Sequence, residues 1–193
     1  MKKHMLVNLL ILAILLMTAA CSSDSGTAPV ITVGSSELTL GDFRPSTLST
    51  EDFEIGVPGG GLPIGNMPGN SWMSGFLTAT KDHHSYAYLY IYNPKKEEVP
   101  YIGATVYKID LNMDKDDTSF WSDDSILING INFYGMDAEG VKTAMANYKL
   151  NSDSETYLYY KDGKYGYSFS IGDDGTVEKV SLEMQIPKSY SSK

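Results

Sequence analysis

Few residues of this chain have the types and the spacing that metal binding or catalysis requires. Two of its three histidines, His83 and His84, follow Asp82 in a segment that we interpret as a turn between two β-strands. Adjacent residues of a strand point to opposite faces, so two such imidazoles rarely bind one ion, and further ligands are not visible nearby. We therefore expect a solvated turn here and no metal site.

An acidic segment, DLNMD at 110–114, begins like the calcium loop of an EF-hand. That loop needs glycine at its sixth position and glutamate at its twelfth, where this chain has Lys115 and Trp121. The segment 114–124 is therefore interpreted as a solvated connector.

The glycine-rich segment GVPGGGLPIGNMPGN, at 56–70, lacks the basic residue of a phosphate-binding loop, because no Lys or Arg lies between Arg44 and Lys81. A loop of that kind holds phosphate with aligned N–H groups and a lysine. There is also no G-x-S-x-G motif for a serine hydrolase. We predict a long surface loop at 56–70, no catalytic residues and no cofactor. Paired carboxylates that meet only in the folded chain remain an open alternative.

The composition argues against nucleic-acid binding. The chain has a net charge of −9, and Arg44 is its only arginine, whereas nucleic-acid sites need clustered Lys and Arg. We expect an acidic body of this kind to be repelled by an anionic membrane surface.

The only cysteine, Cys21, follows a short basic start, the apolar stretch 5–17 and the small residues Thr18, Ala19 and Ala20. This order is typical of a secretory signal, and the stretch is shorter than the ~20 residues that span a bilayer. Residues 18–21 resemble the bacterial lipobox, although leucine usually stands where this chain has Thr18. The resemblance implies cleavage before Cys21 and attachment of a diacylglyceryl group to its thiol. It predicts a lipoprotein anchored on the outer face of the bacterial cell membrane.

Beyond the signal peptide at 1–20, we predict a lipidated flexible tether at 21–29, a β-rich α+β unit at 30–115 and an acidic connector at 116–125. A second α+β unit at 126–187 and a tail at 188–193 follow. The predicted body has two layers, with an antiparallel sheet and few short helices. The clearest helix signal is at 136–148, with Asp137 as its N-cap.

The two units share an outline of a strand, a helix and about three strands, which suggests a degenerate tandem repeat. Residues 126–186 contain the segments GINFYGMDAEGVKTAM and YLYYKDGKYGYSFSIGDDGTVEKVSL. They resemble the BamE/SmpA-type and β-lactamase-inhibitor-protein-like folds, in which a helix accompanies an antiparallel meander. Those families serve assembly, inhibition or unknown roles, so the resemblance implies a fold and no functional residues.

Four tyrosines alternate with apolar residues in the strand SYAYLYIYN, at 85–93. Period-two geometry places Tyr86, Tyr88, Tyr90 and Tyr92 on one face and Leu89 and Ile91 on the other. Tyrosine supplies rigid apolar area with a polar tip, as interfaces require. We interpret this face as either an interaction surface or a part of the core covered by the 56–70 loop or the tether. The expected function is non-catalytic binding to a protein or another envelope component; the alternative is an envelope enzyme, such as a hydrolase of cell-wall polymers.

Overall fold

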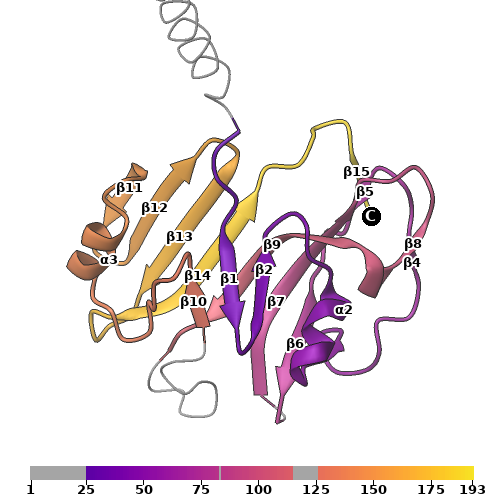
Figure 1. The fold of residues 1–193 in the computed structure, drawn as a ribbon, viewed down its shortest axis with the longest axis horizontal. Coiled ribbons are helices and arrows are strands. Elements are labelled where there is room, and N and C mark those ends of the chain that lie inside the picture. Colours follow the sequence, from indigo (N-terminus) through magenta and orange to yellow (C-terminus); the bar gives the residue numbers. More distant parts are fainter. Residues whose placement is uncertain (1–24, 83, 115–125) are drawn as a thin grey trace, which may run out of the picture.

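The computed structural model describes residues 25–82, 84–114 and 126–193 (Figure 1). Cys21, the predicted signal peptide and the predicted connector at 116–125 lie outside them. The elements of the first half are β1 (Val30–Val33), β2 (Ser36–Thr39), α2 (Pro45–Leu48), η1 (Ser49–Glu51), β3 (Glu54–Gly56), β4 (Asn66–Met67), β5 (Ser71–Trp72), β6 (Leu77–Lys81), β7 (His84–Asn93), β8 (Val99–Pro100), η2 (Tyr101–Gly103) and β9 (Thr105–Asn112). Those of the second half are β10 (Ile126–Ile128), α3 (Ala138–Ala144), β11 (Lys149–Ser154), β12 (Tyr157–Asp162), β13 (Tyr165–Ile171), β14 (Val177–Met184) and β15 (Ser191–Ser192).

Most of these strands belong to one ten-stranded sheet, whose main path runs β11-β12-β13-β14-β9-β7-β5-β15. β6 also pairs with β7, and β3 pairs with β6. All of these pairs are antiparallel except β5 with β15. The predicted α+β body with an antiparallel sheet and few short helices is confirmed.

One face of this sheet forms the core because apolar residues alternate with polar ones along each strand. Two rows of paired residues cross from β7 to β12 on that face, and every member is at most 6% exposed. The rows are Ala87, Leu111, Val180, Phe169 and Leu158, and then Leu89, Ile109, Leu182, Tyr167 and Tyr160.

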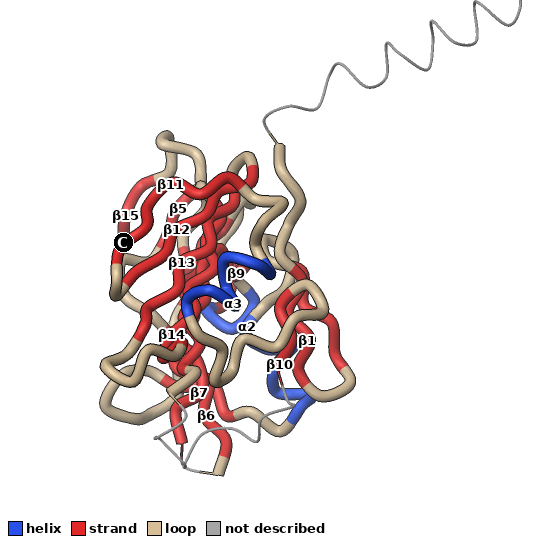
Figure 2. Tube along the Cα trace, turned by 90° about the vertical axis from the view of Figure 1, so that its left-hand side faces the viewer, coloured by secondary structure: helices blue, strands red, loops and turns tan. Residues whose placement is uncertain are grey.

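A second layer covers this face. Figure 1 shows α2, α3 and the small sheet β10-β1-β2 in front of the large sheet, and Figure 2 shows the same layer from the side. α3 begins at its N-cap Asp137, whose Oδ1 accepts a 2.7 Å hydrogen bond from the N–H of Gly140, and it buries Val141 against the core. The predicted cap is confirmed, and the helix is shorter than the predicted 136–148.

The two predicted units share the outline of a helix followed by a meander within this single sheet. α2 precedes the meander β3-β6-β7-β9, and α3 precedes the meander β11-β12-β13-β14. β9 and β14 pair directly and join the two meanders. Each meander has four strands rather than the expected three, because β3 and β11 were not expected. All six residues of β11 are exposed, so it has no alternation of apolar and polar residues to reveal it.

Both ends of the described chain pack on the body. At the start, the N–H of Thr27 donates a 2.8 Å hydrogen bond to Asp162 Oδ2, and Pro29 is buried. At the end, β15 pairs with β5, so the segment predicted as a tail completes the sheet. No helix within the described residues is long and apolar enough to cross a membrane.

Candidate functional site: the open face of the sheet

The face of the large sheet opposite the core carries a row of residues across five strands. The row runs Tyr88, Asp110, Ser181, Ser168 and Tyr159 and contains the direct pairing partners of β7, β9, β14, β13 and β12. Neighbouring strands lie about 4.8 Å apart, so this row spans roughly 19 Å. It therefore places a tyrosine at each end of a polar strip.

The centre of the strip is organised around Asp110, which is only 8% exposed. Its carboxylate accepts a 2.5 Å hydrogen bond from Ser181 Oγ and a 3.1 Å bond from Tyr90 Oη. Lys108 Nζ lies 3.5 Å from Asp110 Oδ1. A carboxylate that loses this much water needs such partners, and here all three come from neighbouring positions of the same face.

Tyr90 is held by contacts on more than one side. Lys108 Nζ lies 4.5 Å from the centre of its ring, within cation–π range. Burial raises the pKa of Tyr90 to about 12, and the negative charge of Asp110 adds to this effect. The phenol is therefore protonated at neutral pH and acts as a hydrogen-bond donor to Asp110.

Aromatic rings continue the surface beside this cluster. The ring of Phe76 lies 4.6 Å from that of Tyr88 and 5.8 Å from that of Tyr90, measured between centroids. Tyr88 is 40% exposed. The two tyrosines thus form a supported aromatic patch with polar tips.

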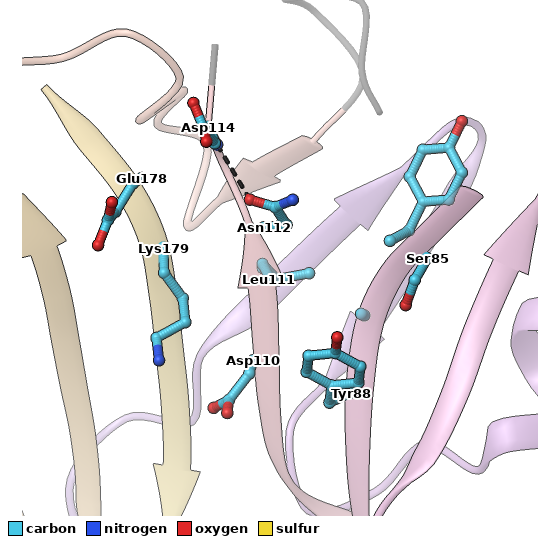
Figure 3. Close-up of a pocket in the computed structure, with 10 residues that line it drawn as sticks. Ser85, Tyr88, Asp110, Leu111, Asn112, Asp114, Glu178 and Lys179 are labelled. Carbon is cyan, nitrogen blue, oxygen red and sulfur yellow. Dashed lines mark hydrogen bonds between the residues drawn. The ribbon is translucent and has the colours of Figure 1, made fainter. Parts of the chain in front are cut away.

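The face is hollowed on both sides of this patch. A hollow of about 280 Å³ lies between β7, β9 and β14, and Figure 3 shows Tyr88, Asp110, Asn112 and Lys179 around it, with Asp114 and Glu178 at the strand ends. A wider groove of about 500 Å³ lies beyond Tyr90, lined by Trp72, Tyr107, Tyr190, Lys108 and Glu183. Burial, with the nearby charge of Glu183, raises the pKa of Tyr107 to about 12.

The four tyrosines predicted to share one face do not share one environment. Tyr88 and Tyr90 lie on the open face. Tyr92 is only 8% exposed, because Tyr107 and Tyr190 pack against it with ring centroids 6.0 and 6.1 Å away. Neither the 56–70 loop nor the tether contributes these covering rings, which come from β9 and the C-terminal segment.

Tyr86 also departs from simple alternation. The pairing of β6 with β7 shifts by one residue next to Tyr86, a bulge that re-aims side chains. The ring of Tyr86 packs edge-on against Phe53 at a centroid distance of 5.3 Å.

Sequence reasoning missed other aromatic residues of this face, among them Phe76, Tyr157 and Tyr159. Phe76 precedes β6, so the alternation of buried and exposed residues within a strand does not assign it to a face. Tyr157 and Tyr159 alternate with the buried residues Leu158 and Tyr160, the same signal that singled out the tyrosines of β7. Tyr157 is 38% exposed, and its hydroxyl donates a 2.9 Å hydrogen bond to Ser168 Oγ.

A separate apolar surface lies on the loop between β3 and β4. Leu62 and Ile64 are 75% and 86% exposed. Gly59, Gly60, Gly61 and Gly65 around them have positive φ angles, which glycine adopts without strain. The predicted long surface loop is thus present, and it presents two uncovered apolar side chains.

The described residues contain no group of three or more His, Cys, Asp or Glu side chains placed to hold a metal ion. His83 and the side chain of His84 lie outside the described part of the chain. Asp110 belongs to strand β9 rather than to a loop of the calcium-binding kind.

No protein-family model, curated protein or solved structure matched this chain. The resemblance of residues 126–186 to known folds therefore stays a prediction.

Proposed function

We propose that this chain is a lipid-anchored, extracytoplasmic binding protein of the bacterial envelope, and that it binds its partner with the open face of the sheet. The proposed anchor is a diacylglyceryl group on Cys21. The proposed partner is a protein or another component of the envelope, and the contact is non-catalytic.

One observation carries the binding proposal: aromatic rings flank an organised polar strip on a sheet face that the second layer leaves uncovered. Tyrosine is enriched at protein interfaces because it offers a large rigid area and a polar tip. Here Tyr88 and Tyr159 stand about 19 Å apart, a span that suits a patch of the ordinary interface size of about 800 Å² per partner.

The polar strip adds specificity to this aromatic area. The carboxylate of Asp110 already accepts hydrogen bonds from Ser181 and Tyr90. A partner therefore does not have to compensate for a buried unpaired carboxylate. Lys108 and Lys179 bring positive charge, and Glu183 brings negative charge, to the same surface. A partner with complementary charges would be oriented by them.

Site-specific photocrosslinking tests the proposal. A photoreactive aromatic amino acid would replace Tyr88 on the open face, and a matched variant would carry it in place of Tyr134, before α3. After irradiation of intact cells, we expect a discrete adduct from position 88 and none from position 134. Identical adduct patterns at both positions, or none at position 88, would contradict the proposed binding face.

A double variant then measures how much the rings contribute. Replacing Tyr88 and Tyr159 with Ser removes both ends of the aromatic row while leaving Asp110 and its donors intact. We expect capture of the crosslinked partner to fall at least tenfold. The denaturation midpoint should fall only modestly, because Tyr88 is exposed and Tyr159 is half-buried. Retained capture by the folded double variant would move the binding surface elsewhere.

A further inference from the structure

The start of the described chain is pinned to one end of the large sheet. Gly26 lies so close to the turn between β12 and β13 that an added Cβ would be 2.0 Å from the carbonyl oxygen of Asp162. The N–H of Thr27 donates to the carboxylate of Asp162, and the hydroxyl of Tyr167 donates a 3.5 Å bond to the carbonyl of Thr27. The N–H of Val30 donates a 2.8 Å hydrogen bond to Asn129 Oδ1. The chain therefore leaves the body at the β12–β13 turn, as Figure 1 shows.

This exit point leaves little chain between the body and the proposed lipid. From Cys21 to Gly26 there are five Cα–Cα steps, which reach about 18 Å when fully extended. A folded body of this size has a radius of gyration of about 16 Å and is thus roughly 40 Å across. The link is shorter than the body is wide, so the β12–β13 end must lie near the membrane.

The same end carries exposed positive charge, although the chain as a whole is acidic. Lys161 and Lys164 flank the β12–β13 turn, and Lys149 is the direct pairing partner of Lys161 on β11. The N–H of Gln185 donates to the carbonyl of Lys164, which places the segment after β14 beside the turn. Exposed Lys188 follows three residues later and lines the neighbouring groove with Lys108. The acid of this turn, Asp162, already binds the N–H of Thr27.

The opposite ends of these strands carry the opposite charge. The turn between β13 and β14 holds exposed Asp173 and Asp174, and exposed Glu178 follows in β14. β13 runs from Tyr165 to Ile171, so the two ends lie about 20 Å apart. The body is thus positive where the chain leaves it and negative at the far end.

We propose that the β12–β13 end of the sheet is a membrane-facing surface, and that Lys149, Lys161, Lys164 and Lys188 contact the phosphate groups of anionic lipids. This inference rests on the lipid anchor of the proposed function. Lysines near an anionic leaflet are attracted within a Debye length, about 8–10 Å, which the short link permits. The acids at this end are Asp162 and exposed Glu183, which pairs with Gly166, and the four lysines outnumber them. The acids at the far end of these strands lie beyond the Debye length.

Because lipidation would consume the only thiol, an introduced cysteine can be labelled uniquely in the mature lipoprotein. One variant, Gln185→Cys, carries a fluorophore at the basic end. Its matched control, Thr156→Cys, carries the fluorophore at the exposed turn between β11 and β12, at the far end. Both lipoproteins are reconstituted in vesicles of phosphatidylglycerol and phosphatidylcholine that carry a nitroxide quencher on the lipid headgroup.

We expect quenching at position 185 to exceed that at position 156 by at least threefold. Adding Lys161→Gln and Lys164→Gln should reduce the quenching at 185 by at least half, and so should vesicles of phosphatidylcholine alone. The same charge change made at Lys179, toward the far end of β14, should leave it unchanged.

Flotation of the vesicles separates the two levels of the proposal. Lipoprotein that floats but is quenched equally at both positions, or more strongly at 156, overturns the membrane-facing end and leaves the anchor standing. If quenching at position 185 still exceeds that at 156 after both the lysine replacements and the removal of anionic lipid, the phosphate contact is overturned. Protein that does not float overturns the anchor, and the membrane-facing end with it.

Discussion

Ser181 donates a 2.5 Å hydrogen bond to Asp110 across β14 and β9, the two strands that join the meanders of the sheet. This contact links the two halves of the chain on the open face. At the next paired position of the same two strands, Leu111 and Val180 belong to the core. Asp110 is therefore a structural residue of the junction as well as the centre of the candidate binding surface.

Replacing Asp110 with Ala should destabilise the fold by about 1–3 kcal/mol, because the hydroxyls of Ser181 and Tyr90 lose their acceptor in a half-buried setting. Urea denaturation followed by circular dichroism measures this change. The exposed Asp173→Ala serves as a control and should stay within about 0.5 kcal/mol of the parent. If the two variants were equally stable, Asp110 would not hold the junction together.

Stability should fall as the pH rises from about 10 to about 12. Burial raises the pKa values of Tyr90 and Tyr107 to about 12, above the ordinary value of 10.0. Across this interval the folded chain keeps protons that the unfolded chain has released, so alkali favours unfolding. The stabilisation is fully present below pH ~10 and is lost as the pH passes the folded-state value. Denaturation midpoints taken across this range measure it, and Tyr90→Phe should flatten the curve. A profile unchanged by Tyr90→Phe would contradict this assignment.

The N-cap of α3 gives a local test of the second layer. Replacing Asp137 with Ala removes the acceptor for the N–H of Gly140 and should cost about 0.5–2 kcal/mol. Asp137→Asn retains a side-chain oxygen and should recover most of the loss. Thermal denaturation distinguishes the two. Equal destabilisation by both substitutions would mean that the carboxylate acts through something other than the cap.

The lipid anchor is tested at Cys21. Cys21→Ser should abolish incorporation of a clickable fatty acid, because the thioether that carries the diacylglyceryl group cannot form. The protein should then accumulate in an uncleaved or released form. Labelling of growing cells followed by gel fluorescence measures this, and label that is undiminished in the variant would rule out lipidation at this residue.

Alternation along single strands was readable from the sequence because it is a local property. Val180, Leu182 and Met184 are buried between more exposed neighbours, and the cap at Asp137 depends only on residues three positions apart. The hairpin β6–β7 and the helix at Pro45–Leu48 follow from turn chemistry and proline. These features depend on contacts within a few residues, which the order of the amino acids alone determines.

Pairing between distant segments could not be read in the same way. The junction of β9 with β14 brings Asp110 to Ser181, 71 positions away in the sequence. The identity of one residue does not predict that the other will be its partner. Tyr92 became core because a register shift in β9 and the C-terminal segment placed Tyr107 and Tyr190 over it.

The sequence by itself thus determined the class of the fold, most of the strands with their buried faces, and the cap of α3. Only the tertiary structure decided which tyrosines stand open, which acid lies at the centre of the face, and at which end of the sheet the chain leaves the body. The physical reason is that burial and charge environment depend on strand order and register. Those are set by the packing of the whole domain rather than by neighbours in sequence.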